Sequence, residues 1–322
     1  MVKSLESKKS IISLLTKYGD YLIENGIIGF EDKTSKTWFV EKNGKIVTDD
    51  FSLNGNSGIA LFFAYLSIVA KTKYFIYTSQ EAMLEPIEKI IFDNKFDLNV
   101  LIDVVFVLSN IYKNLDKNNL RITIIKGIDI ISYYIINNPE QAFKYNLNIL
   151  ISSYELFDFN KKQLMKLFKV INNFLYKKYK IGDLEFLNKN HMNDLIIYLA
   201  RASKISHNEK MNKVISKLLQ IQRHKKIIPN NKNLLSRLML KESQYPDDII
   251  DKEIYDGLKK VMNDEINLKN KNLSGLYDIV KKLDIMEYAK NVCGDELIDD
   301  NKNFYIKEIL NHPALKVQGM GK

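Results

Sequence analysis

Two glycines stand in front of an apolar run in the stretch FSLNGNSGIALFFAYL, which runs from Phe51 to Leu66. A Gly-x-x-Gly segment can hold a phosphate against its backbone N–H groups, and it can also form a tight turn at the start of a helix. A phosphate-binding loop has a strand before it and Lys-Ser or Lys-Thr after it, and neither pattern surrounds Gly55 and Gly58. The motif therefore favours a structural turn that opens a buried helix.

Aspartates near the expected helix starts are the second set of residues that suit chemistry. Asp49 and Asp50 are adjacent carboxylates, which fit general acid–base catalysis, but a carboxylate there also caps the following segment, and we favour the capping role. A carbohydrate-cleaving enzyme needs two carboxylates that face each other, roughly 5–10 Å apart. The aspartates available for such a pair are Asp50, Asp103, Asp194 and Asp278.

Few residues offer sulfur or imidazole ligands, because the chain has one cysteine, Cys293, and four histidines. A zinc site with two thiolates cannot form within such a chain, and neither can an intrachain disulfide. His191 precedes an expected helix, where it acts either as an acid–base group or as a capping or packing residue. The other histidines, His207, His224 and His312, lie among charged or turn residues, and we expect them to be solvated.

The composition predicts an almost entirely α-helical chain. Of the 322 residues, 46% are hydrophobic and 27% are charged, with only 13 glycines and 5 prolines to interrupt helices. Ile and Val residues recur at spacings of three and four instead of alternating, so strand signals are weak. Apolar helical segments start roughly 40 to 50 residues apart, as helical pairs do. These segments are Gly58–Leu66, Asp103–Tyr112, Asn146–Phe157, Leu195–Ala202, Asn233–Leu240 and Gly275–Leu283.

Amphipathic helices with charged faces lie between the apolar segments, at residues 81–94, 121–136, 161–179 and 208–226. A helix that is apolar around most of its circumference must be surrounded by protein, whereas a helix with a charged stripe lies outside. We therefore expect an all-α fold, an α/α toroid of about six or seven helical hairpins, with an open superhelix of hairpins as the alternative. One domain spans residues 1–322, and residues 312–322 form a flexible tail.

The stretch LNGNSGIALFFAYLSIVAKTKYF, which begins at Leu53, resembles the first inner-helix motif of the lanthionine synthetase C-like (LanC-like) family. This family includes the cyclase domains of class II lanthipeptide synthetases. Upstream, the pattern GDYLIENGI…W, which ends at Trp38, is similar to the lead-in of those domains, and we expect Trp38 to fill the core. Two later repeats also resemble the family, one with His191 at its histidine position and one, NKNLSGLYDIVKKL, that matches at Gly275, Asp278 and Ile279.

The resemblance implies a zinc site in active family members, made of two cysteines and one histidine. There the zinc lowers the pKa of a substrate thiol, which adds to a dehydrated Ser or Thr and closes a thioether ring. In this chain Asn270 and Lys271 stand where the Cys-His pair belongs, and the preceding repeat has no cysteine. Asn is a poor zinc ligand, and a lysine ammonium repels a dication. We therefore expect neither metal nor cofactor.

The leading hypothesis is a pseudo-cyclase that binds a precursor peptide or its leader, or a partner dehydratase or lanthipeptide synthetase, without making bonds. The alternative is a metal-free cyclase in the same fold. In that enzyme His191 is the general base and Lys271 is the cation that stabilises an oxyanion. A carbohydrate-active α/α toroid is the third hypothesis.

The charge balance favours an acidic partner, because 48 Lys and Arg residues against 39 Asp and Glu residues give a net charge of +9. No helix-turn-helix, aromatic RNA-binding or zinc-finger pattern points to a specific nucleic acid. The longest apolar stretch, Gly58–Ala70, is too short to span a bilayer. Charges occur throughout the N-terminal segment, unlike in a signal peptide, so we expect a cytoplasmic protein without a transmembrane segment.

Overall fold

The computed structural model describes residues 2–28, 34–93, 97–115, 118–145, 147–156, 161–184, 192–206, 209–224, 231–263, 273–294 and 304–307. The chain folds into two compact units, which are described separately below. Unit 1 consists of Met1–Ile11 and Tyr176–Lys322, and unit 2 is Ile12–Leu175. The helices α1 (Val2–Glu24) and α8 (Lys161–Lys180) each run from one unit into the other. The expectation of one domain over the whole chain stays a prediction.

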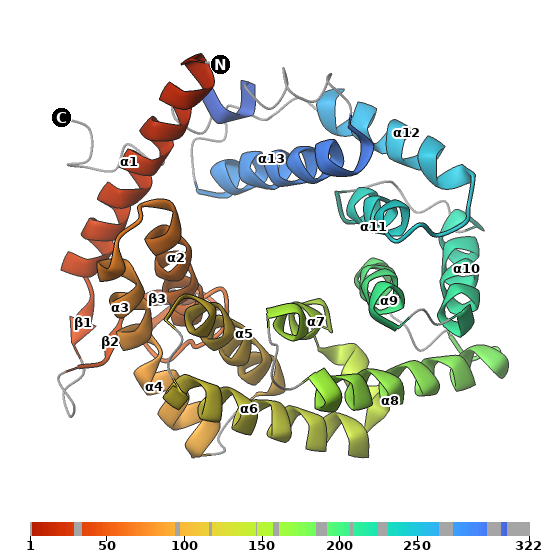
Figure 1. The fold of residues 1–322 in the computed structure, drawn as a ribbon, viewed down its shortest axis with the longest axis horizontal. Coiled ribbons are helices and arrows are strands. Elements are labelled where there is room, and N and C mark those ends of the chain that lie inside the picture. The colour runs from red at the N-terminus through yellow and green to blue at the C-terminus, as the bar shows by residue number, and fades with distance from the viewer. Residues whose placement is uncertain are drawn as a thin grey trace. The chain divides into compact units, whose positions relative to one another are not determined.

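Unit 2 is built on three apolar helices (Figure 1). Helix α5 (Leu98–Leu115) packs against both α2 (Asn56–Val69) and α7 (Leu147–Leu156). Two further helices cover them, because α3 (Lys73–Ala82) packs on α2 and α6 (Asn118–Asn137) packs on α5. A 3-10 segment, η2 (Pro139–Lys144), leads from α6 toward α7. The largest fully buried side chains in this unit include Phe63, Phe75, Met83, Ile91, Leu101, Ile102, Leu108, Ile111, Ile124 and Ile128.

Unit 1 repeats this arrangement with a different set of helices (Figure 1). Helix α11 (Asn231–Glu242) contacts α9 (Met192–Ser206), α12 (Ile249–Asn263) and α13 (Leu273–Cys293), while α10 (Glu209–His224) packs on α9. Helix α10 shows the amphipathic pattern plainly, since its apolar residues recur every three or four positions and are buried. These residues are Met211, Val214, Ile215, Leu218 and Leu219.

The mainly helical prediction is confirmed. The described residues of each expected apolar segment fall in a helix, in the order α2, α5, α7, α9, α11 and α13, and the amphipathic helices α6, α8 and α10 lie between them along the chain. Among the described residues, none of the helices combines the length and the apolar character needed to cross a bilayer. Closure of the hairpins into a ring stays a prediction.

The amphipathic helix expected at residues 81–94 is interrupted. Helix α3 ends at Ala82, a short turn α4 (Leu84–Pro86) follows, and the chain then continues as the π-helical segment η1 (Ile87–Phe92). Pro86 has no N–H to donate, so it removes one hydrogen bond of a continuous α-helix and its ring crowds the preceding turn. The apolar side chains are still buried on one side, since Ile90 and Ile91 face the core.

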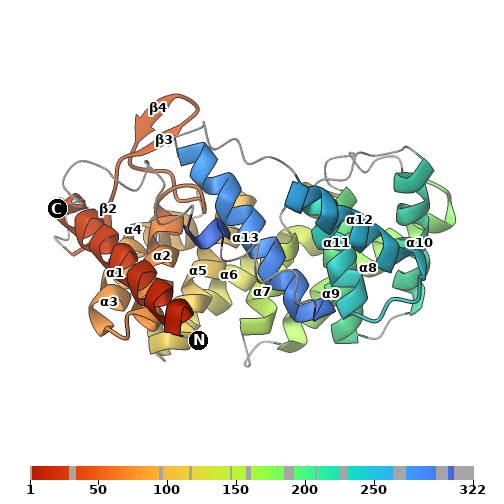
Figure 2. The same ribbon diagram turned by 90° about the horizontal axis from the view of Figure 1, so that it is seen from above.

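Two short antiparallel strand pairs occur in unit 2, where the sequence was interpreted as almost entirely helical. Strand β1 (Ile27–Ile28) pairs with β2 (Lys36–Thr37), and β3 (Val40–Lys42) pairs with β4 (Lys45–Val47). The β3–β4 turn is Asn43-Gly44, with φ values of 53° and 74°. A two-residue Asn-Gly turn with positive φ at both positions is the preferred hairpin connection, because its twist matches that of the strands. The β3–β4 hairpin projects from the helices of its own unit (Figure 2).

Candidate functional site

The residues proposed for metal-free catalysis lie outside the described part of the chain. His191 and Lys271 belong to this group, as does Asn270, so their roles stay predictions. The same holds for His207, His312 and the expected tail at 312–322. Asp278 lies in α13, of which Cys293 is the last residue, and His224 is exposed in the last turn of α10, as expected.

The opening of α2 in unit 2 brings several of the other candidates together. A Cβ atom at Gly55 would lie 2.2 Å from the carbonyl oxygen of Asp50, and one at Gly58 would lie 2.1 Å from that of Leu53. Both distances are far too short, so only glycine fits at these positions without a backbone shift. The expected tight turn is confirmed, although the close contacts are with the preceding turn and not with another helix.

Asp50 holds this turn together. Its Oδ1 accepts a hydrogen bond from the Ser52 N–H at 3.1 Å and lies 3.4 Å from Lys42 Nζ, while its carbonyl oxygen accepts the Asn56 N–H at 2.7 Å. Burial raises the pKa of Asp50, but the Ser52 hydrogen bonds and Lys42 outweigh it, so the pKa lies below its ordinary value. The N-cap residue of α2 is Gly55, so Asp50 does not cap that helix itself. Asp50 caps the turn instead.

Asp103, in the second turn of α5, is a carboxylate whose pKa is shifted in the opposite direction from that of Asp50. Its Oδ2 accepts the Leu53 N–H at 2.9 Å, which joins α5 to the turn before α2. Burial raises the pKa of Asp103 to about 6 against the effect of this hydrogen bond, and the negative charges of Asp50 and Asp97 add to the rise. Two neighbouring carboxylates whose pKa values move in opposite directions can divide acid and base roles between them.

Asn56, which the sequence analysis did not single out, ties the strand segment to α2. Its Oδ1 accepts the Trp38 N–H at 2.8 Å, and its Nδ2 donates to the carbonyl oxygens of Thr48 at 2.7 Å and of Trp38 at 3.3 Å. Trp38 is in the core, as expected, and its Nε1–H donates to the carbonyl oxygen of Leu22 at 2.7 Å. The sequence did offer a signal for this role, because Asn56 is a polar residue between the two glycines and directly precedes an apolar run.

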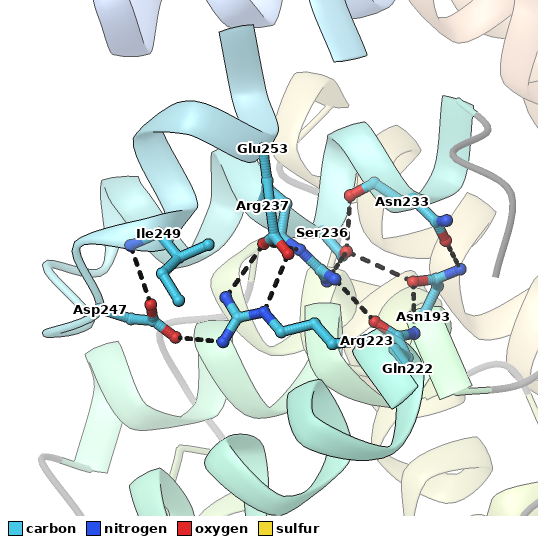
Figure 3. Close-up of polar contacts among 9 residues, drawn as sticks. All are labelled: Asn193, Gln222, Arg223, Asn233, Ser236, Arg237, Asp247, Ile249 and Glu253. Atoms are coloured by element: carbon cyan, nitrogen blue, oxygen red, sulfur yellow. Dashed lines mark hydrogen bonds and ion pairs between the residues drawn. The ribbon is translucent and has the colours of Figure 1, made fainter. Parts of the chain in front are cut away.

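Unit 1 contains a larger polar cluster, which the sequence analysis missed (Figure 3). Its charged half is centred on Glu253 of α12. Arg223 donates from Nε to Oε1 of Glu253 at 2.9 Å and from Nη2 to Oε2 at 3.1 Å, and Arg237 donates from Nε to Oε2 at 2.8 Å. Asp247 accepts from Nη1 of Arg223 at 3.0 Å and also accepts the Ile249 N–H at 3.1 Å. Two guanidinium groups therefore face two carboxylates.

The neutral half of the cluster continues from the buried guanidinium of Arg237. This group donates from Nη2 to Gln222 Oε1 at 2.9 Å and from Nη1 to Ser236 Oγ at 3.1 Å. Gln222 donates onward to Asn193 Oδ1 at 2.9 Å, and the Asn193 amide donates to Asn233 Oδ1. Burial lowers the pKa of Arg237, although Glu253 opposes this effect. The cluster thus links α9, α10, α11 and α12 through satisfied side chains.

The opening of α2 in unit 2 and the polar cluster in unit 1 differ in the chemistry that they can carry out. The unit 1 cluster balances its charges and satisfies its amides, which suits a structural role. At the α2 opening, by contrast, Asp103 can exchange a proton near neutral pH. Asp194 forms an exposed ion pair with Lys232 at 3.0 Å. Among the described residues, no group of three or more His, Cys, Asp or Glu side chains is placed to hold a metal ion.

Comparison of this chain with protein-family models, with curated proteins and with solved structures gave no match. The function is therefore argued from the residues of the chain itself.

Proposed function

We propose that this protein is a catalytically degenerate LanC-like protein, a pseudo-cyclase, that binds a precursor peptide or its leader during the maturation of a lanthipeptide or a related peptide. In this proposal the helical hairpins close into an α/α toroid in the cytoplasm. A dehydratase or lanthipeptide synthetase is the second partner, to which the bound peptide is presented.

The opening of α2 is the observation that carries the proposal. The resemblance to the family rests on the Gly-x-x-Gly segment, and Gly55 and Gly58 are required by the geometry of that turn. The helical hairpins support it as well. In unit 2, α2 pairs with α3 and α5 with α6, and in unit 1, α9 pairs with α10 and α11 with α12. Successive pairs of one apolar and one more polar helix are the building unit of such a toroid.

The charge of the chain supports an acidic peptide as the ligand. A net charge of +9 attracts an acidic leader over long distances and raises the rate of encounter. The same attraction makes binding sensitive to salt, because ions screen it.

A fluorescence titration tests the proposal. A labelled acidic precursor peptide is titrated with the full chain at low and at high salt, and a basic peptide of the same length is the control. We expect the acidic peptide to bind with a Kd on the order of micromolar, about −8 kcal/mol, and to bind more weakly at high salt. Absence of binding at concentrations on the order of 100 µM, with the synthetase also failing to bind, would reject the proposal.

A second candidate function is an enzyme that works without a metal. The observation that favours it is Asp103, whose pKa of about 6 suits a general acid or base at neutral pH. In the metal-free cyclase His191 and Lys271 stay the proposed base and oxyanion-stabilising cation, whereas in a carbohydrate-active enzyme Asp50 and Asp103 form the carboxylate pair. If the protein catalyses either reaction, and His191→Ala or Asp103→Asn abolishes turnover while the variant stays folded, one of these enzymes is supported. If the reactions proceed at equal rates with and without the protein, both enzymes are excluded.

A further inference from the structure

The outer edge of β3 has the geometry of an unpaired strand. In the β3–β4 hairpin, Lys42 pairs with Lys45 next to the two-residue turn, and Glu41 pairs with Ile46 one position further along. In such a hairpin the pair beside the turn exchanges hydrogen bonds, and the next pair does not. The backbone N–H and C=O groups of Glu41, and by the same alternation those of Phe39, therefore point outward from β3.

The two edges of the hairpin differ in what covers them. On the β4 side, the carbonyl oxygen of Thr48 accepts hydrogen bonds from Asn56 Nδ2 at 2.7 Å and from Thr37 Oγ1 at 3.0 Å. On the β3 side, no hydrogen bond from the described part of the chain reaches the main-chain groups of Phe39 or the outward groups of Glu41. The hairpin also projects from the helices of its unit (Figure 2). A free strand edge of this kind is a template for pairing with another chain.

The side chains of the hairpin give its two faces opposite characters. Phe39, Glu41 and Ile46 lie on one face, where Phe39 and Ile46 are 69% and 75% exposed. Lys42 and Lys45 lie on the other face, because successive side chains of a strand alternate. Over residues 34–48 three lysines stand against one glutamate, which gives a net charge of +2. A chain added to β3 would therefore lie beside Phe39 and Glu41 on one face and beside Lys42, whose Nζ is 3.4 Å from Asp50 Oδ1, on the other.

We propose that the outer edge of β3 binds an extended segment of a peptide by strand addition, and that apolar and acidic residues alternate in that segment. This inference rests on the proposed function, since it names the place and the pattern of the peptide that the pseudo-cyclase binds. The main-chain groups of Phe39 and Glu41 pair with the peptide backbone. Alternate peptide side chains lie beside Phe39 on one face and beside Lys42 on the other, and Ile46 and Lys45 of β4 extend these two faces one strand further in.

A second copy of this chain fits the edge less well than an acidic peptide. Two hairpins paired through β3 would bring the lysines of both copies together, and like charges across a strand pair are unfavourable. Lysines at strand edges are also a common means by which proteins avoid pairing with themselves. The acidic peptide turns the same lysines into attractive contacts.

Two substitutions at Glu41 separate backbone pairing from charge. Glu41→Pro removes the outward N–H, and proline is tolerated on an edge strand where its missing N–H faces solvent. We expect this variant to bind an alternating apolar–acidic peptide about tenfold more weakly, which corresponds to about 1.4 kcal/mol. Glu41→Ala removes a negative charge but keeps the N–H, so it should bind the same peptide as tightly as the wild type or more tightly.

Peptide variants and a matched surface control complete the experiment, which uses the full chain and fluorescence anisotropy. N-methylation of the peptide amides that face β3 should abolish binding, whereas methylation of the intervening amides should not. Ile46→Glu should weaken binding about tenfold, and Ile181→Glu, at a position that is 72% exposed in unit 1, should leave it unchanged. Far-UV circular dichroism of each variant confirms that it folds.

The outcomes distinguish this inference from the proposed function. Suppose that the wild type binds the peptide, that Glu41→Pro binds it as tightly, and that the wild type binds both methylated peptides as tightly as the unmethylated one. The inference is then overturned, while the proposed function stands. If the wild type binds no acidic peptide, the inference is overturned, and the proposed function is overturned with it when the synthetase also fails to bind. If the wild type forms a dimer and Glu41→Pro abolishes it, the edge of β3 binds a second copy of the chain, and the peptide is overturned as its occupant.

Discussion

The α2 opening in unit 2 and the polar cluster in unit 1 both include buried asparagines at the starts of helices but differ in how their polar groups are compensated. In both units a buried asparagine lies in the first turn of an apolar helix, Asn56 in α2, and Asn193 and Asn233 in α9 and α11. In unit 1 the asparagines continue into amides, two arginines and two carboxylates that satisfy one another (Figure 3). In unit 2 the same region holds a carboxylate, Asp103, that burial destabilises in its charged form.

This difference favours unit 2 over unit 1 as the place of the proposed function. A satisfied buried network fixes the packing of the helices around it and leaves no group for a ligand. A carboxylate whose pKa is raised by burial lowers stability at neutral pH, and such groups concentrate at functional sites. The free strand edge of β3 also lies in unit 2. We therefore propose unit 2 as the binding unit and a structural role for the unit 1 cluster.

The largest expected effect comes from breaking the unit 1 cluster at its centre. Glu253→Ala leaves the guanidinium groups of Arg223 and Arg237 without their shared carboxylate. Removal of one partner from a fully buried charge pair typically costs about 3–5 kcal/mol. The side chains of Glu253 and Arg223 are 25% and 27% exposed, so the free energy of unfolding should fall by less, about 2–3 kcal/mol. Urea unfolding measures it. Glu253→Gln, which keeps hydrogen-bonding atoms, should lose less, and a loss below about 1 kcal/mol for Glu253→Ala would mean that the cluster is not structural.

The next effect concerns the turn before α2. Gly58→Ala places a Cβ 2.1 Å from the carbonyl oxygen of Leu53, and this backbone atom cannot rotate away. We expect a loss of about 1–3 kcal/mol in the free energy of unfolding, as for an overpacked site. The matched control is Gly257→Ala in α12, where the nearest atom is the flexible Leu234 Cδ1 at 3.1 Å. Alanine is about 1 kcal/mol better than glycine in a helix, so the control should be neutral or stabilising. Equal losses for both variants would contradict the role of the turn.

A smaller effect, with the opposite sign, is expected at Asp103. Its pKa is about 6 when folded against an ordinary value of 3.8, so the folded state binds the proton more tightly. The contribution of Asp103 to stability is therefore complete at low pH and falls as the pH rises from about 4 to about 6. Asp103→Asn keeps an acceptor for the Leu53 N–H without the charge. This variant should be about 1 kcal/mol more stable than the wild type at pH 7.5, with allowance for partial exposure, and should unfold with a flatter pH profile.

Thermal and urea unfolding of both proteins at pH 4.5 and at pH 7.5 check this prediction. At the lower pH the difference between wild type and Asp103→Asn should shrink, since the wild-type carboxyl is then mostly protonated. A variant that is less stable than the wild type at pH 7.5, or an unchanged pH profile, would show that Asp103 is compensated as fully as the unit 1 cluster.

The sequence predicted the helices well because their signal is local. Each apolar segment, such as Gly58–Leu66 or Leu195–Ala202, repeats at the helical period, and the structure places it within a helix. The tight turn at Gly55 and Gly58 was predictable for the same reason. The β3–β4 hairpin was missed although Asn43-Gly44 is a strong turn signal, because its strands have only three residues each.

The polar contacts were not predictable from local patterns. Asn193, Gln222 and Arg237 lie on three different helices, and they meet only when those helices pack. The Leu53–Asp103 hydrogen bond likewise joins residues 50 positions apart. The sequence placed Asp103 near a helix start, but the raised pKa depends on tertiary burial, and periodicity carries no information about it.

Amide hydrogen exchange of the full chain, with and without a saturating acidic peptide, tests the assignment of binding to unit 2 most directly. We predict slower exchange at Phe39 and Glu41 in the presence of the peptide and unchanged exchange in α9–α12. Slower exchange in α9–α12 with none at β3 would contradict the account.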